Sequence, residues 1–161
     1  MSEDRSEAEA RRDQNTPRPL VLLLSGPNLG LLGEREPLIY GNDTLADHVE
    51  RARATAEEQG LAIEHLQSDH EGVLVEAVHG ARGRAAAIVI NAAALTHYGW
   101  SLHDALAAFE GPVIEVHLSN PNARESWRHT SVLAPVATGT ISGLGSLGYE
   151  LALRAVARLV A

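Results

Sequence analysis

The sequence of 161 residues contains neither cysteine nor lysine. Without cysteine, the chain has no thiol nucleophile, no disulfide and no thiolate ligand for a metal. Without lysine, it can form neither a Schiff base with a carbonyl compound or pyridoxal phosphate nor the phosphate contact of a Walker-type loop. Apart from histidine, every basic side chain is therefore an arginine.

Aromatic residues and positive charge are scarce, and the apolar runs are short. The net charge of −8 and the aromatic content of 4% argue against a protein that binds the nucleic-acid backbone or stacks bases. Apolar runs such as 20–24 have the length of a strand, and the charged segment 1–17 lacks the apolar stretch of a secretory signal. We therefore expect a cytoplasmic protein without a membrane span, and interpret residues 1–17 as a disordered N-terminal tail.

Short apolar runs alternate with longer amphipathic segments from residue 20 onward. They predict strands near 20–24, 61–67, 86–90, 113–118 and 133–137, and helices near 44–59, 71–81, 100–109, 122–127 and 145–160. Thr44 is a helix cap and Gly60 a helix stop. This order predicts one α/β domain over 18–161, with a flavodoxin-like, doubly wound, five-stranded parallel sheet.

Polar side chains follow the first, third and fourth of these strands. The first run is followed by the turn 25–28, which ends at Asn28; the third ends at Asn91, and the fourth leads into the segment 117–120. In an open parallel sheet, the ligand site lies at the carboxyl ends of the strands. We therefore expect these residues to meet at one edge of the sheet.

The segment 26–41 is long for a connection between a strand and a helix, and such loops are often lids or binding loops. It carries Arg35 and Tyr40. A free tyrosine has a pKa of about 10, and a neighbouring guanidinium favours the phenolate. An Arg–Tyr pair on a closing loop can thus supply a general base, although such a pair more often only packs on the surface.

Glu115 and His117 are two residues apart on a predicted strand, so both side chains point to the same face. A carboxylate there can select the imidazole tautomer and suit the histidine to act as a general acid. The backbone N–H groups of Leu118 and Ser119 can hold a carboxylate. Arg124 and Arg128 lie four apart, so on a helix they share one face, which is either a solvated surface or a face from which Arg128 reaches a substrate oxyanion or hydroxyl. Asn91, His97 and Asp104 are suited to orienting a polyhydroxylated ring.

Two familiar motifs do not fit the chain. The segment 143–148 matches G-x-G-x-x-G, but a dinucleotide site needs a following strand and an acidic residue about twenty positions later. We interpret it as a tight turn that lets the last helix pack closely on the sheet. The histidines lack the spacing of a metal site, and no cofactor is expected.

Taken in order, several segments resemble the type II dehydroquinases. The matching runs are GPNL-x-LLG-x-REP-x-IYG at 26–41, QSDHEG at 67–72, the loop from Asn91 to His97, IEVHLSN at 114–120, ARESWRHTS at 123–131 and ATG-x-I-x-GLG-x-x-GY at 137–149. The resemblance covers nearly all of 20–160. It implies an enzyme that converts 3-dehydroquinate to 3-dehydroshikimate and water by anti elimination through an enolate, without a cofactor.

The resemblance also implies a role for each candidate residue. Tyr40, assisted by Arg35, is the base; His117, supported by Glu115, is the acid; Asn28 stabilises the enolate through an ordered water. The implied substrate-binding residues are Asn91, His97, Leu118, Ser119, Arg128 and, from a neighbouring subunit, Asp104. The implied assembly is a homododecamer of four trimers.

The segment 98–101, Tyr-Gly-Trp-Ser, departs from the pattern of the family, which has small residues there. Its aromatic side chains bear on substrate preference and on the contact between subunits. Two other interpretations of the chain are a flavodoxin-like binding module, such as a flavin protein, and a homologue that has lost activity and serves as a scaffold. The joint presence of Asn28, Arg35, Tyr40 and His117 argues against the second.

Overall fold

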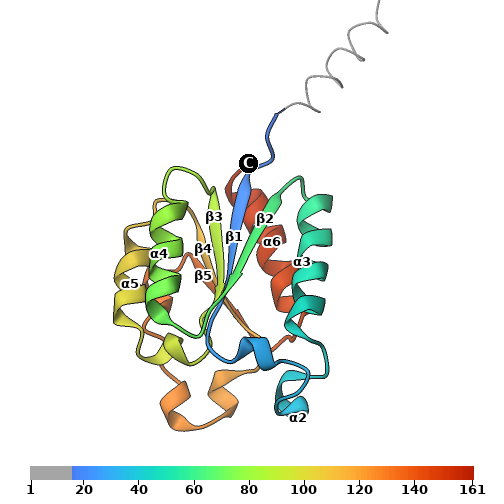
Figure 1. Ribbon diagram of the computed structural model, residues 1–161, viewed down its shortest axis with the longest axis vertical. Helices are drawn as coiled ribbons and strands as arrows, with labels where there is room; N and C mark the ends of the chain where they lie inside the picture. The colour runs from blue at the N-terminus through green and yellow to red at the C-terminus, as the bar shows by residue number, and fades with distance from the viewer. Residues whose placement is uncertain (1–15) are drawn as a thin grey trace, which may run out of the picture.

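Five parallel strands form one sheet at the centre of the structure, a computed structural model that describes residues 16–161 (Figure 1). The strands are β1 (Leu20–Ser25), β2 (Ala62–Gln67), β3 (Ala87–Asn91), β4 (Val113–His117) and β5 (Gly139–Ser142). Their order across the sheet, β2-β1-β3-β4-β5, is that of flavodoxin-like folds. The expected fold class is therefore confirmed, whereas nearly all of the expected tail at 1–17 lies outside the described residues.

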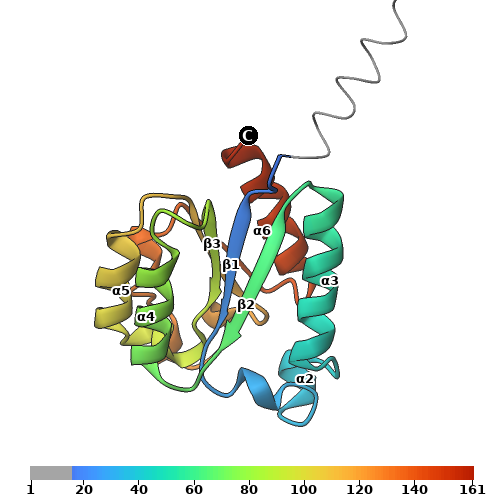
Figure 2. The ribbon, with the colours of Figure 1, turned by 45° about the horizontal axis from the view of Figure 1, so that its top comes forward.

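Helices cover both faces of the sheet, as Figure 2 shows. One face carries α3 (Leu45–Glu58) and α6 (Leu147–Leu159); the other carries α4 (Glu71–Ala81) and α5 (Trp100–Ala107). Within 16–161, no helix is both long enough and apolar enough to cross a membrane.

Alternate residues of the strands enter two separate cores. Val21, Leu23 and Val89 pack against α3 and α6, whereas Leu22 and Ile90 pack against α4 and α5. Because both faces are covered, β1, β3 and β4 are almost wholly buried. This explains why their sequences are continuous apolar runs.

The predicted start and end of α3 are confirmed. The hydroxyl of Thr44 accepts the N–H of Asp47, whose carboxylate accepts the N–H of Thr44 in return, forming a capping box. Gly60 follows the helix with φ 71°, a left-handed conformation that glycine adopts without a Cβ clash.

The last third of the chain departs from the expected elements. The strand expected at 133–137 is instead a 3-10 turn, η5 (Ala134–Val136), and β5 begins at Gly139. Pro135 lacks the N–H that a strand ladder needs, and only alternate residues of β5 are partly buried, so its apolar signal is weak. The helix expected at 122–127 is two 3-10 turns, η3 (Pro121–Ala123) and η4 (Ser126–Arg128).

The glycine-rich segment 143–148 forms a turn that leads into α6, as predicted. Gly143 and Gly145 have positive φ angles, so the helix begins at Leu147 rather than near 145. A Cβ built on Gly148 would lie 3.2 Å from Val116 Cγ1 and 3.6 Å from Ile141 Cγ2. Gly148 therefore lets α6 pack closely against β4 and β5.

Candidate active site

A pocket lies at the carboxyl edge of the sheet, where β1, β3 and β4 end. The sheet register pairs Ser25 with Asn91 and Ile90 with Glu115, so the loops after these strands begin side by side. The N–H of Gly26 donates to the carbonyl of Asn91 at 2.8 Å, which joins the first two loops directly. Two short segments, η1 (Leu29–Leu31) and α2 (Pro37–Tyr40), lie at this end of the molecule (Figure 1).

Nine of the eleven candidate residues line this pocket, which encloses about 680 Å³ when its open mouth is included. They are Asn28, Arg35, Tyr40, Asn91, His97, His117, Leu118, Ser119 and Arg128. Glu115 is fully buried beside His117, and Asp104 is exposed on α5 outside the pocket lining. The expected meeting of these segments at one edge is confirmed.

Tyr40 ends the single-turn helix α2, which begins at Pro37, a favourable first residue of a helix. Its hydroxyl accepts a hydrogen bond of 2.8 Å from Nη1 of Arg124, which also contacts Ser119 Oγ at 3.3 Å. The guanidinium carbons of Arg35 and Arg124 lie 5.6 and 5.3 Å from the centre of the phenol ring. Two guanidinium groups therefore lie against Tyr40, and that of Arg124 also donates a hydrogen bond to its hydroxyl.

His117 and Glu115 point to the same side of β4, as their spacing predicts. His117 Nε2 lies 2.8 Å from Glu115 Oε1, and His117 is only 9% exposed. A carboxylate accepts hydrogen bonds and donates none when ionised, so Nε2 carries a proton in this contact. The nitrogen left to face a ligand in the pocket is then Nδ1.

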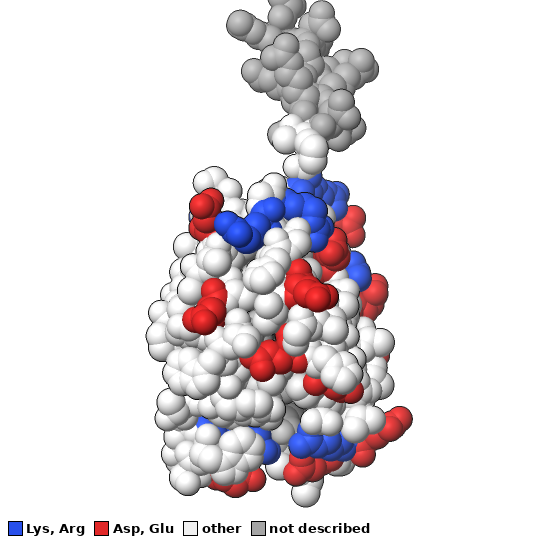
Figure 3. Space-filling view, turned by 60° about the vertical axis from the view of Figure 1, so that its left-hand side comes forward, with Lys and Arg blue, Asp and Glu red and all other residues white. Residues whose placement is uncertain are grey.

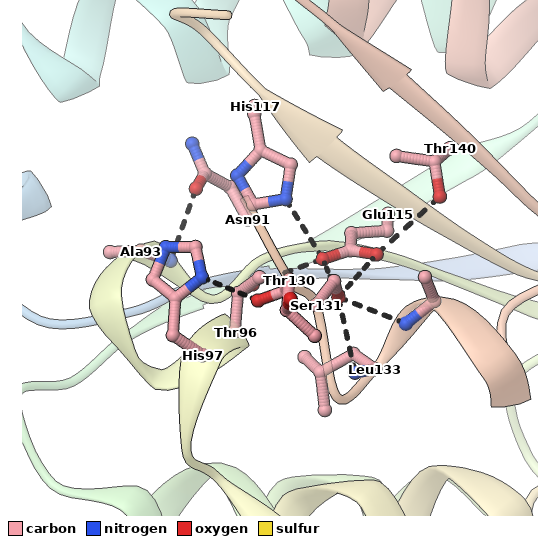
Figure 4. A network of polar contacts seen from close by, with 11 residues as sticks. Asn91, Ala93, Thr96, His97, Glu115, His117, Thr130, Ser131, Leu133 and Thr140 are labelled. Carbon is pink, nitrogen blue, oxygen red and sulfur yellow. Dashed lines mark hydrogen bonds and ion pairs between the residues drawn. The ribbon is translucent and has the colours of Figure 1, made fainter. Parts of the chain in front are cut away.

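Glu115 keeps its charge in a fully buried position because hydrogen-bond donors surround it. Burial acts to raise the pKa of its carboxyl group, but hydrogen bonds from His117, Ser131 and Thr96, with the charge of His117, hold that pKa below its ordinary value. The donors reach Oε1 from Thr96 at 3.0 Å and from Ser131 at 2.7 Å, and Oε2 from Thr140 at 3.4 Å. Figure 4 shows this network.

Asn91 and His97 are each held by hydrogen bonds to other parts of the chain. Asn91 donates its amide N–H to the buried Tyr149 hydroxyl at 3.1 Å and accepts the N–H of Ala93 at 3.2 Å. Burial raises the pKa of Tyr149 to about 12, so this hydroxyl stays protonated. His97 Nδ1 lies 2.8 Å from the carbonyl oxygen of Thr130, which leaves Nε2 for a ligand (Figure 4).

Asn28 has a left-handed backbone, with φ 65°, at the turn after β1. Its N–H donates to Asp69 Oδ1 at 2.9 Å, and that oxygen also accepts Gln67 Nε2 at 3.1 Å. Gln67 Nε2 reaches the carbonyl oxygen of Gly26 at 3.2 Å as well. The end of β2 thus holds the turn that presents Asn28 to the pocket.

The remaining candidates follow β4. The carbonyl oxygens of Leu118 and Ser119 accept the N–H groups of Gly145 and Gly143, which anchors this turn to the loop after β5. Arg128 donates to Glu125 Oε2 at 2.7 Å and stacks on Trp127. Arg124 and Arg128 do not share one helix, since Arg124 falls between η3 and η4, yet both line the pocket.

Sequence reasoning missed several residues that position the site. It predicted Arg35 as the partner of Tyr40. It did not predict the hydrogen bond that Arg124, 84 residues away, donates to the hydroxyl of Tyr40. It also missed Thr96, Ser131, Asp69 and Tyr149, which hold Glu115, Asn28 and Asn91 from other elements. Nothing in their local sequence signals these long-range contacts.

The fold and the pocket together define an α/β protein with a polar site at the carboxyl edge of a parallel sheet. The family model described as "Dehydroquinase class II" matches residues 19–157. The chain therefore belongs to the class II dehydroquinase family, as the resemblance of its motifs implied.

Relatives and solved structures agree with this assignment. The chain is 52% identical over 143 residues to 3-dehydroquinate dehydratase 2 of Pseudomonas putida, covering 89% of this chain and 96% of the relative. It is 56% identical over 133 residues to 3-dehydroquinate dehydratase 2 of Pseudomonas aeruginosa, covering 83% and 90%. The type II dehydroquinase of Propionibacterium acnes superimposes with a TM-score of 0.83 at 47% identity, covering 86% and 96% of the two chains.

Proposed function

We propose that the protein is a 3-dehydroquinate dehydratase, which removes water from 3-dehydroquinate to give 3-dehydroshikimate. The names of its relatives support the substrate, and family membership supports the reaction. The observation that carries the proposal is the presence of two opposite proton-transfer groups in one pocket. Tyr40 lies against two arginines, and His117 is bonded to a buried carboxylate.

The reaction begins at the carbon next to the ketone, whose proton is acidified by the carbonyl. The phenolate of Tyr40 takes this proton, and the electron pair moves into the carbonyl to form an enolate. Arg35 and Arg124 stabilise the phenolate before the transfer. Asn28, acting through an ordered water, stabilises the negative enolate oxygen.

The enolate then expels the hydroxyl group from the neighbouring carbon. The carbonyl re-forms, a carbon–carbon double bond appears in conjugation with it, and the departing hydroxyl takes a proton from Nδ1 of His117 to leave as water. The elimination is anti, so base and acid act on opposite faces of the ring. Tyr40 then holds one extra proton and His117 lacks one, and exchange with solvent restores both.

The substrate-binding residues have distinct tasks. Asn91, His97 and Arg128 bind the hydroxyl groups of the ring, and the N–H groups of Leu118 and Ser119 bind the carboxylate. Asp104 serves the pocket of a neighbouring subunit, in keeping with its exposed position on α5 outside the pocket lining of its own chain. The reaction serves either the shikimate pathway or quinate breakdown, since both use the same dehydration.

We propose a homododecamer of four trimers in the cytoplasm, without a nucleic-acid partner. The surface near α5 supports assembly, because Tyr98 and Trp100 are 59% and 63% exposed. Figure 3 shows that uncharged side chains cover most of the α4–α5 side, with scattered acidic residues between two small arginine groups. Light scattering should give a mass twelve times that of the 17.2 kDa chain.

The decisive experiment follows the ultraviolet absorbance of purified protein mixed with 3-dehydroquinate. A growing band of the conjugated enone, abolished in Tyr40→Phe, establishes the reaction and its base together. The variant must keep the circular dichroism spectrum and the assembly of the parent. If Tyr40→Phe keeps most of the rate, Tyr40 is not the base. If the parent gives no band while a control enzyme does, the proposed reaction is wrong.

A further inference from the structure

The hydroxyl group of Ser131 can donate its hydrogen bond in only one direction. Its oxygen accepts the N–H of Leu133 at 3.1 Å and the N–H of Ala134 at 2.9 Å. A serine hydroxyl has two acceptor lone pairs and one donor proton. With both lone pairs occupied, the proton is directed to Glu115, whose oxygens lie 2.7 and 3.1 Å away (Figure 4).

The segment around Ser131 also reaches the other histidine of the pocket. The carbonyl oxygen of Thr130 contacts His97 Nδ1 at 2.8 Å, and the N–H of Val132 donates to the carbonyl of Thr96 at 2.7 Å. Three consecutive residues therefore join the loop after β3 to the carboxylate on β4. These contacts hold Ser131 Oγ within hydrogen-bond distance of Glu115.

We propose that Ser131 is a positioning residue for catalysis, whose directed hydroxyl shares the charge of Glu115 and so controls how tightly His117 holds the proton that it delivers. The proposal rests on the role of His117 as the acid. It follows from the geometry of a chain of contacts: two backbone N–H groups direct Ser131, Ser131 donates to Glu115, and Glu115 bonds Nε2 of His117.

The direction of the effect follows from charge sharing. A carboxylate that receives fewer hydrogen bonds keeps more of its charge for the imidazole. Without the hydroxyl of Ser131, Glu115 should therefore attract the Nε2 proton more strongly, so that His117 becomes a weaker acid. The other donors to Glu115 are Thr96 on η2 (Ala93–His97) and Thr140 on β5.

Other charged and titratable groups lie around His117 and must be kept constant. They line the same pocket from the loop after β1, from α2, from η2 and from the segment after β4. They are Arg35, Tyr40, His97, Arg124 and Arg128. None of them forms a hydrogen bond with Ser131 Oγ among the described residues, so a substitution at Ser131 leaves their direct contacts in place.

The test compares Ser131→Ala with the parent over the pH range in which both stay folded. In Ser131→Ala, kcat should fall about tenfold with little change in KM, since the acid acts in the chemical step. The alkaline limb of the kcat profile, which reports loss of the acid's proton, should move up by roughly one pH unit. Ser131→Thr, which keeps a hydroxyl, should restore both quantities.

Glu115→Gln provides a control of opposite sign, because an amide cannot attract the Nε2 proton by charge. Its alkaline limb should move to lower pH. Ser142→Ala removes an exposed hydroxyl on β5 and should match the parent. If Ser131→Ala does not fold, Ser131→Cys keeps the size of the side chain with a weaker donor, and its limb should move in the same upward direction.

A fall in kcat with an unmoved alkaline limb overturns the proposal, because a purely structural defect lowers the rate equally at every pH. Failure of Ser131→Thr to recover the parent profile overturns it as well. The role of His117 is tested separately by His117→Ala, whose kcat should fall far more than its KM changes. If His117→Ala keeps the rate of the parent, His117 is not the acid, whatever the result at Ser131.

Discussion

Nη1 of Arg124 lies 2.8 Å from the hydroxyl of Tyr40, although the two residues are 84 positions apart in the chain. Tyr40 comes from the loop after β1, and Arg124 comes from the loop after β4. The proposed base is therefore completed only when both loops occupy the carboxyl edge of the sheet. A guanidinium at this distance stabilises a phenolate by a charge-assisted hydrogen bond.

Replacement of Arg124 by Met should lower kcat by about 100-fold or more. The hydroxyl of Tyr40 then loses its charge-assisted hydrogen bond from the guanidinium. Arg124→Lys should recover part of the rate, since it keeps the charge but loses the planar guanidinium. Steady-state kinetics tests this, with the exposed Arg158→Met as the control. An unchanged kcat in Arg124→Met contradicts the role of this contact.

Substitution of Asp69 by Ala should reduce kcat about tenfold by releasing the turn that carries Asn28. The N–H of Asn28 loses its acceptor, and the left-handed backbone at φ 65° loses the contact that holds it. Asp69→Asn keeps an acceptor oxygen and should retain most of the rate. Kinetics of both variants, beside the exposed Glu76→Ala, provide the comparison. Equal rates in Asp69→Ala and Asp69→Asn argue that the side-chain oxygen at position 69, which accepts the N–H of Asn28, does not hold this turn.

His48 should make the protein less stable as the pH falls below about 6.5, the ordinary value for histidine. Burial lowers the pKa of His48 in the folded state, and its two ring nitrogens have no hydrogen-bond partner among the described residues. As the pH falls, His48 therefore binds a proton in the unfolded chain before it does so in the folded chain. Stability is highest above the unfolded pKa and decreases as the pH falls toward the folded one, by up to about 1.4 kcal/mol per pH unit.

Thermal unfolding of His48→Leu from pH 7.5 to 5 measures this contribution. The variant should lose less stability on acidification than the parent. Burial also lowers the pKa of His65, so part of the pH dependence should remain. The exposed His79→Asn is the matched control. Parallel curves for the parent and His48→Leu refute the assignment.

Two glycines in helices should respond in opposite directions to substitution. Gly148→Val should cost about 1–3 kcal/mol, because even a Cβ at that position lies 3.2 Å from Val116 Cγ1. Gly80→Ala should add roughly 0.5–1 kcal/mol, since no atom lies within 4 Å of the new Cβ and alanine favours a helix. Thermal midpoints at one protein concentration test both. A Gly148→Val variant as stable as the parent contradicts the close approach of α6 to the sheet.

The sequence by itself determined the fold class and most of the element positions. Continuous apolar runs mark β1, β3 and β4 because both of their faces are buried, and Thr44 marks the start of α3 through a local capping contact. The same strand periodicity places Glu115 beside His117. All of these signals act over a few residues, so they can be seen in the chain before it folds.

The tertiary structure decided which distant side chains complete the site. Arg124 reaches Tyr40, Asp69 holds Asn28 and Ser131 donates to Glu115 only because crossover connections bring separate loops to one edge of the sheet. The prediction of a strand at 133–137 was wrong for a related reason. The strand β5 is defined by its pairing with β4 rather than by its own apolar pattern. Long-range hydrogen bonds leave no periodic trace in a sequence, whereas burial and capping do.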